Sequence, residues 1–135
     1  MDNGWILTAA LLALAGPAFA TPVDGALRVD LNGDGKAEAV TVKQSPKTIT
    51  LDVQSNVSGE PQTLEFGVDR ARQDAVCKSP VELKVVDLLC DPMDEPLSGC
   101  KVGNGAKGLI LVDGECDPIQ LYWDHENEKL TWWRL

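Results

Sequence analysis

Oxygen-bearing side chains alternate along one short segment of the chain, residues 30–38, which reads DLNGDGKAE. Ca²⁺ is a hard cation that binds about six to eight oxygen atoms at about 2.3–2.6 Å. Alternate residues of a tight loop can turn their oxygen atoms inward together, so the spacing suits such an ion. We predict a calcium site formed by the side chains of Asp30, Asn32, Asp34 and Glu38 and the backbone carbonyl of Lys36.

The glycine in the middle of this segment, Gly35, permits the sharp turn that such a loop needs. An EF-hand loop also requires a glutamate at its twelfth position and a helix on each side. Thr41 stands at that position and the flanking residues are typical of strands, so the EF-hand and dockerin interpretations fail. The alternative is a turn without a metal, because Asn-Gly and Asp-Gly dipeptides form turns unaided.

The segment resembles the calcium loop of FG-GAP and VCBS-type β-repeat proteins, which has the form D-x-N-G-D-G-x-x-[DE] followed by an apolar strand. Residues 39–42 (AVTV) supply that strand here. The resemblance covers residues 30–42 and implies a loop between two β-strands, with ligands at Asp30, Asn32, Asp34, Lys36 and Glu38. The chain carries one copy of the loop, so the resemblance does not imply the propeller that several copies form.

The elements that must position this loop are predicted to be strands. Short apolar runs recur between clusters of Gly, Pro, Asn and Asp, near residues 27–31, 40–42, 49–53, 64–68, 81–85, 109–112, 118–123 and 129–134. Most of them alternate with polar residues, whereas residues 109–112 are apolar on both faces and predict a central strand. A single helical turn is plausible over residues 69–77. We predict an all-β protein, a single-domain sandwich or meander of about seven to eight short antiparallel strands spanning residues 21–135.

The C-terminal residues predict a hairpin with a specific register. If residues 125–128 form its loop, Trp123 faces Leu130 and Leu121 faces Trp132. Tyr122 and Trp133 then lie on the outer face of the sheet. These two aromatic residues are a possible binding surface for a carbohydrate or a partner protein.

Four cysteines, Cys77, Cys90, Cys100 and Cys116, predict two disulfide bonds, because an even number of cysteines follows a candidate secretion signal. Three pairings are possible, and the short loops favour Cys77–Cys90 with Cys100–Cys116. Zinc binding is the alternative, but zinc ligands come in close pairs and these cysteines are widely spaced. A C-x-x-C redox motif is absent from the sequence.

The N-terminal residues 1–20 are predicted to be a signal peptide that is cleaved after Ala20. Its apolar run, residues 6–15, is too short to cross a membrane, and Ala18-Phe19-Ala20 fits the small-x-small cleavage pattern. The n-region carries Asp2 and no Lys or Arg, which is unusual, and an N-terminal helix of a cytosolic protein is the alternative. We predict a periplasmic or extracellular protein with no membrane span in its mature part.

Charge excludes one class of partner. The chain has 12 basic and 21 acidic residues, a formal net charge of −9, which opposes binding to nucleic acid. Common catalytic motifs such as G-x-S-x-G and H-E-x-x-H are absent. We therefore predict a calcium-stabilised binding or accessory module without catalytic activity. A small hydrolase that uses acidic residues, or an enzyme inhibitor with a disulfide-held loop over residues 91–101, is the alternative.

Overall fold

The computed structural model describes residues 26–55, 57 and 59–135. Nine strands form within these ranges: β1 (Ala26–Val29), β2 (Glu38–Gln44), β3 (Thr48–Gln54), β4 (Gln62–Val68), β5 (Ala75–Val76), β6 (Glu82–Asp87), β7 (Lys107–Val112), β8 (Ile119–Asp124) and β9 (Lys129–Trp133). The predicted signal peptide, residues 1–20, and its cleavage site lie outside the described residues.

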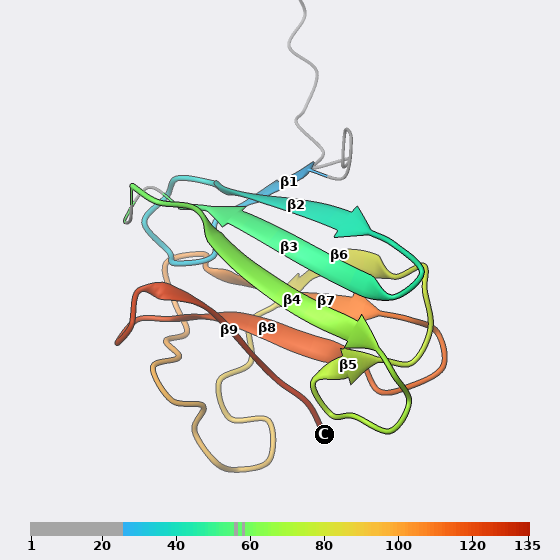
Figure 1. Ribbon diagram of the computed structural model, residues 1–135. Helices are drawn as coiled ribbons and strands as arrows, with labels where there is room; N and C mark the ends of the chain where they lie inside the picture. Colours follow the sequence, from blue (N-terminus) through green and yellow to red (C-terminus); the bar gives the residue numbers. More distant parts are fainter. Residues whose placement is uncertain (1–25, 56, 58) are drawn as a thin grey trace, which may run out of the picture.

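The strands form two sheets that pack face to face, as Figure 1 shows. The first sheet has the order β1-β2-β3-β4-β5 and the second has the order β6-β7-β8-β9, so each sheet follows the order of the chain. All neighbouring strands are antiparallel except β4 and β5, which are parallel. The prediction of an all-β single-domain sandwich is confirmed, with a short extra strand, β5, that the sequence pattern did not reveal.

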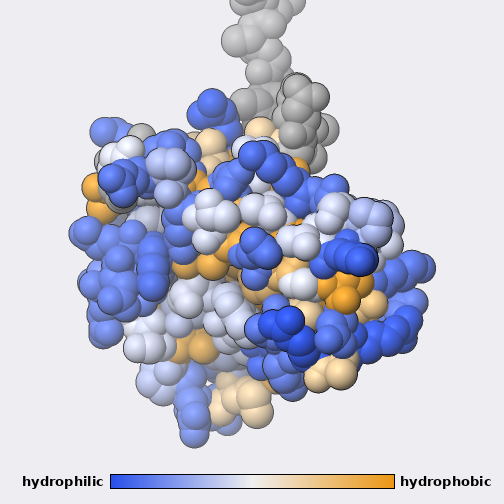
Figure 2. Space-filling model, in the orientation of Figure 1, coloured by the Kyte–Doolittle hydropathy of each residue, from blue (hydrophilic) through white to orange (hydrophobic). Residues whose placement is uncertain are grey.

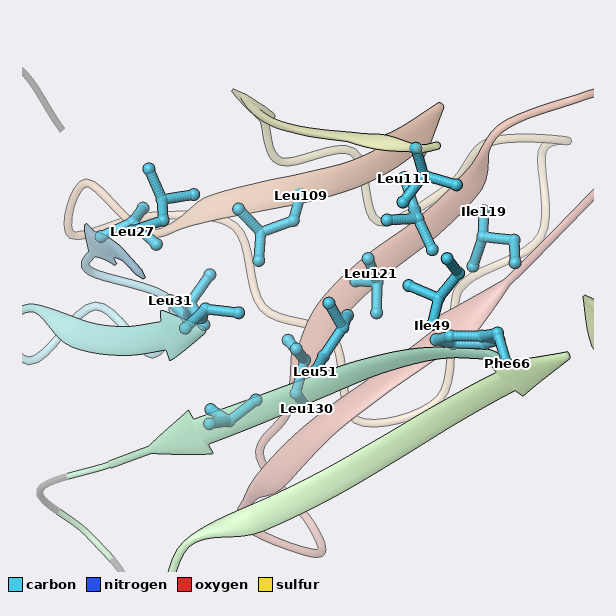
Figure 3. Packing of buried hydrophobic residues seen from close by; sticks show 14 of the residues in the cluster. Leu27, Leu31, Ile49, Leu51, Phe66, Leu109, Leu111, Ile119, Leu121 and Leu130 are labelled. Carbon is cyan, nitrogen blue, oxygen red and sulfur yellow. The ribbon is translucent and has the colours of Figure 1, made fainter. Parts of the chain in front are cut away.

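The core lies between the two sheets, where alternate residues of each strand point inward. Figure 3 shows side chains from both sheets meeting there, with Leu51 and Phe66 on one side and Leu109 and Leu121 on the other. All four are at most 2% exposed. Polar residues cover most of the face drawn in Figure 2, where hydrophobic residues form separate small patches.

The predicted register of the C-terminal hairpin is confirmed. Trp123 pairs with Leu130 and Leu121 pairs with Trp132 in the β8–β9 ladder. Inward-facing Leu121, Trp123 and Leu130 are almost completely buried. The alternation of apolar and polar residues was sufficient to predict this register, because a shift of one residue would turn every core side chain toward water.

The favoured disulfide pairing is wrong. Cys77 is bonded to Cys116 and Cys90 to Cys100, and no described cysteine is free. The first bond links the residue after β5 to the loop between β7 and β8, and so joins the two sheets. Loop length could not select the pairing, because the cost of closing a chain loop grows only slowly with its length.

The helical turn predicted over residues 69–77 is also wrong. The described part of the chain contains no helix, and these residues form turns followed by β5. Asp69 accepts a hydrogen bond from the backbone N–H of Ala71, and its own N–H donates to the carbonyl of Val76. Tertiary pairing with β4 therefore decides the conformation of this segment, whose local helix preference is weak.

Two glutamine side chains connect the sheets by pairing with the backbone. The Gln62 side chain accepts from Leu130 N–H (2.8 Å) and donates to Leu130 O (2.7 Å), which joins β4 to β9. Gln44, at the end of β2, makes the same pair of bonds with Val81 at 2.7 and 3.1 Å. Each primary amide therefore replaces the neighbouring strand that these backbone groups lack.

Replacing Gln62 with leucine should lower the free energy of unfolding by about 1–3 kcal/mol, because two backbone groups of Leu130 would lose their partner. Gln54→Leu is the matched control, since Gln54 is exposed and its one side-chain bond is 3.5 Å long. Urea denaturation should show that the free energy of unfolding of the control differs from that of the wild type by less than about 0.5 kcal/mol. Equal stability of both variants would contradict the bridging role.

Candidate metal centre

The predicted calcium loop connects β1 to β2. Asp30 follows the last residue of β1, and Glu38 is the first residue of β2. Gly33 and Gly35 have positive φ angles of 77° and 84°, which glycine adopts without strain. The two strands pair directly, with Val29 opposite Glu38, so the whole loop closes over one end of the sheet.

Hydrogen bonds hold the acidic side chains inside the loop. The two carboxylate oxygens of Asp30 accept from Gly33 N–H (2.8 Å) and Gly35 N–H (3.0 Å). Asp34 accepts from Lys36 N–H at 2.8 Å, and the Asn32 oxygen accepts from Asp34 N–H at 3.0 Å. These bonds draw the backbone around the carboxylates and fix the direction of each side chain.

Glu38 is the unusual residue of the loop because its carboxylate is completely buried, at 0% exposure. One oxygen, Oε2, accepts a 2.6 Å hydrogen bond from Leu31 N–H. The other, Oε1, has no hydrogen-bond partner among the described residues. A buried ionised oxygen without a partner costs several kcal/mol, and a proton, a bound water molecule or a cation would lower that cost.

The three acidic side chains converge on one point. Asp30, Asp34 and Glu38 each place a carboxylate oxygen within 4.8 Å of those of the other two. Two ligands on opposite sides of a Ca²⁺ ion are separated by twice the metal–oxygen distance, about 4.6–5.2 Å. The spacing therefore fits oxygen ligands around a single ion, and among the described residues no lysine or arginine forms an ion pair with any of the three.

Burial raises the pKa of Glu38 above its ordinary value of 4.5, and the nearby carboxylates of Asp34 and Asp30 raise it further. The backbone N–H groups of Leu31 and, to a smaller extent, Asn32 act in the opposite direction and lower the pKa. A bound divalent cation would reverse the balance, because it favours the ionised carboxylate. The loop therefore holds a destabilised negative charge in a position where a cation could neutralise it.

The loop also contacts the second sheet through the segment that leads into β7. The carbonyl of Asp30 accepts a 2.9 Å hydrogen bond from Lys107 N–H. A Cβ atom added to Gly33 would lie 3.3 Å from the Cβ of Asn104 and 3.5 Å from that of Ala106. Sequence patterns do not indicate this contact, because residues 30 and 107 are far apart in the chain.

The remaining predicted ligands are less closely defined. Asn32 lies in the loop with its oxygen bonded to Asp34 N–H, and its Nδ2 is buried without a hydrogen-bond partner among the described residues. The Lys36 side chain is exposed, which leaves its carbonyl as the group that it can offer to an ion. The structure thus brings together the three carboxylates of the predicted set.

A second acidic group, around Asp113, has a structural role. Its carboxylate accepts from the backbone N–H groups of Cys77 (2.6 Å), Glu115 (2.8 Å) and Cys116 (2.9 Å). It thereby fixes both ends of the disulfide that joins the sheets. Because both cysteine sulfurs are in that bond, they are not free to bind a metal.

The predicted aromatic surface is altered by the loop between β6 and β7. Tyr122 is only 7% exposed, and its hydroxyl donates to Ser98 O in that loop at 2.9 Å. Trp133 is half-buried on the same outer face of the second sheet. The two residues therefore line a hollow rather than form a flat exposed platform.

The comparisons with known proteins found no relative of this chain. No protein-family model matches the chain, and searches of curated proteins and of solved structures find no match.

Glu38→Gln should stabilise the calcium-free protein above pH 4.5. The raised pKa means that folding favours the protonated carboxyl, so this contribution is present below the unfolded value of 4.5 and is lost as the pH rises through the folded pKa. Urea denaturation in the presence of a chelator measures the free energy of unfolding at each pH. The difference between the variant and the wild type should grow in favour of the variant as the pH rises. Glu65→Gln, an exposed change on β4, should follow the wild type. Parallel curves for Glu38→Gln and the wild type would contradict the buried, unpartnered charge.

Proposed function

We propose that the protein is a secreted, non-catalytic binding or accessory module whose first β-hairpin is stabilised by Ca²⁺. The observation that supports it is the buried Oε1 of Glu38, which has no hydrogen-bond partner within residues 26–55, 57 and 59–135 and lies beside the carboxylates of Asp30 and Asp34. The ligand set would comprise these three carboxylates, the side chain of Asn32 and the carbonyl of Lys36, completed by water. This is the ligand set that the FG-GAP and VCBS resemblance implies.

The covalent structure is compatible with secretion. The structure contains two disulfide bonds. Disulfide bonds persist in oxidising compartments and are rare in the cytosol. In the described part of the chain, no helix is long and apolar enough to cross a membrane. A domain of this kind would meet millimolar calcium outside the cell, where weak sites of about 10⁻⁴–10⁻³ M are useful.

A second candidate function is inhibition of an enzyme by the loop between β6 and β7. The Cys90–Cys100 disulfide closes this loop, which projects from the second sheet in Figure 1. Backbone hydrogen bonds from Leu97 N–H to Cys90 O (2.7 Å) and from Cys100 N–H to Leu97 O (3.2 Å) hold its two ends together. A projecting loop that is rigid before binding loses little entropy when it enters a cleft.

Calcium should raise the melting temperature of the oxidised protein. At about 10 mM Ca²⁺ and a dissociation constant of about 10⁻⁴–10⁻³ M, mass action contributes about 1.4–2.7 kcal/mol. For a domain of this size, the melting temperature should rise by about 5–10 °C relative to protein in chelator. Mg²⁺ should have a smaller effect, because it demands a tighter octahedral site and loses its water reluctantly.

Asp34→Asn tests whether that shift comes from the loop. Asparagine can still accept the Lys36 N–H bond, so the variant removes a charge while it keeps the turn. The matched control is Asp69→Asn, at an exposed residue that accepts the same kind of bond from Ala71 N–H. The calcium shift should be reduced only in Asp34→Asn. The proposal would be refuted if millimolar calcium left the melting temperature of the wild-type protein unchanged.

A further inference from the structure

The outer face of the second sheet contains a hollow beside Gly108 in β7. Gly108 pairs with Val86 of β6, and a Cβ added to it would lie 3.5 Å from Val86 Cγ2 and 3.6 Å from Leu88 Cδ1. The nearest atom to such a Cβ would be the carbonyl oxygen of Leu121, at 3.3 Å, so the space directly over Gly108 is already filled. Gly108 is one of the residues that line a depression of about 260 Å³ on this face. We call it the Gly108 hollow; its lining includes Leu88, Leu89, Pro92, Tyr122, Trp133 and Leu135.

Exposed hydrophobic residues gather at the rim of the Gly108 hollow. Leu89 is 57% exposed and Leu135 is 63% exposed, and both line it. Met93, which follows the lining residue Pro92, is 67% exposed. Single exposed apolar residues are ordinary, but a group of them around a concave site is typical of a binding surface.

The wall of the hollow is fixed in place before any ligand binds. The Cys90–Cys100 disulfide closes the segment that contains Pro92 and that begins directly after Leu89. The hydroxyl of Tyr122 donates to Ser98 O, and His125 N–H donates to Gly99 O at 2.9 Å. These contacts attach the loop to β8 and to the turn that follows it, so little order remains to be gained on binding.

Acidic residues of the loop between β6 and β7 indicate the kind of partner. The acidic residue that lines the hollow itself, Asp87, is paired with Lys107 at 2.7 Å. Asp91, Asp94 and Glu95 are exposed in the same loop, and none of them forms an ion pair with a described lysine or arginine. The whole chain carries a net charge of −9. Such a surface attracts a basic partner and repels an acidic one.

We infer that the Gly108 hollow and the acidic loop beside it form a docking surface for a basic protein, which inserts one large apolar side chain into the hollow. A volume of about 260 Å³ lies below the usual lower limit of about 300 Å³ for small-molecule pockets and suits a single anchoring side chain. The inference rests on the binding-module function proposed above and names the class of partner. It does not depend on whether Ca²⁺ occupies the loop between β1 and β2.

Fluorescence anisotropy with a labelled synthetic peptide tests the inference. The peptide carries a leucine between two blocks of lysine, and its two counterparts replace the leucine with alanine or the lysines with glutamate. The lysine–leucine peptide should bind saturably below about 1 mM, and either replacement should weaken binding at least about tenfold. Equal binding of the leucine and alanine peptides, or no binding of the first peptide, would overturn the inference.

Protein variants locate the binding surface. Leu89→Ser with Met93→Ser should weaken binding about tenfold, whereas Val85→Ser, at a residue that is 40% exposed but outside the hollow, should not. Asp91→Asn with Asp94→Asn and Glu95→Gln should also weaken binding. A control with the same net charge combines three exposed sites outside the loop, Glu65→Gln, Glu82→Gln and Glu126→Gln. Equal losses in both charge variants would show attraction to net charge alone and overturn the inference.

Sedimentation velocity and a thermal shift separate the other outcomes. A dimer of the wild type that is lost in Leu89→Ser would assign the hollow to a second copy of this chain, and competition by neutral oligosaccharides would assign it to a sugar. Either result overturns the inference. A calcium shift in the melting temperature without peptide binding would reject the basic partner alone, while peptide binding without a calcium shift would reject the ion alone.

Discussion

The central constraint in this structure is the carboxylate of Glu38, which is buried at the start of β2 and has one oxygen without a hydrogen-bond partner in the described part of the chain. Asp30 and Asp34 add two more acidic groups within 4.8 Å. Without a counter-charge, folding must either desolvate an anion beside two others or hold a proton there. The divalent ion that we propose would remove both costs, and the hairpin would then depend on calcium for part of its stability.

The loop that connects β1 to β2 also contacts the second sheet. Asp30 O accepts a hydrogen bond from Lys107 N–H, and Gly33 packs against Asn104 and Ala106. Residues 103–106 lead directly into β7, whose second residue, Gly108, lines the hollow. The proposed ion site and the proposed docking surface therefore share one stretch of backbone, although each can be tested separately.

The all-β fold, most strand positions and the C-terminal register followed from alternation, because each strand buries one face. The ligand types and their spacing were also local, so the convergence of Asp30, Asp34 and Glu38 could be predicted. The disulfide pairing could not, since it depends on how the two sheets meet. The Gly108 hollow was equally hidden, because it depends on the register of β7 against β6 and on a loop folding back over β8.

The most direct measurement of the central claim is a crystal structure of the oxidised protein grown with calcium, with anomalous diffraction used to locate the ion. The account predicts one peak between the carboxylates of Asp30, Asp34 and Glu38, with Glu38 Oε1 within about 2.3–2.6 Å of it. A well-ordered loop without a peak under saturating calcium, or a peak elsewhere while Glu38 Oε1 contacts only protein, would contradict it.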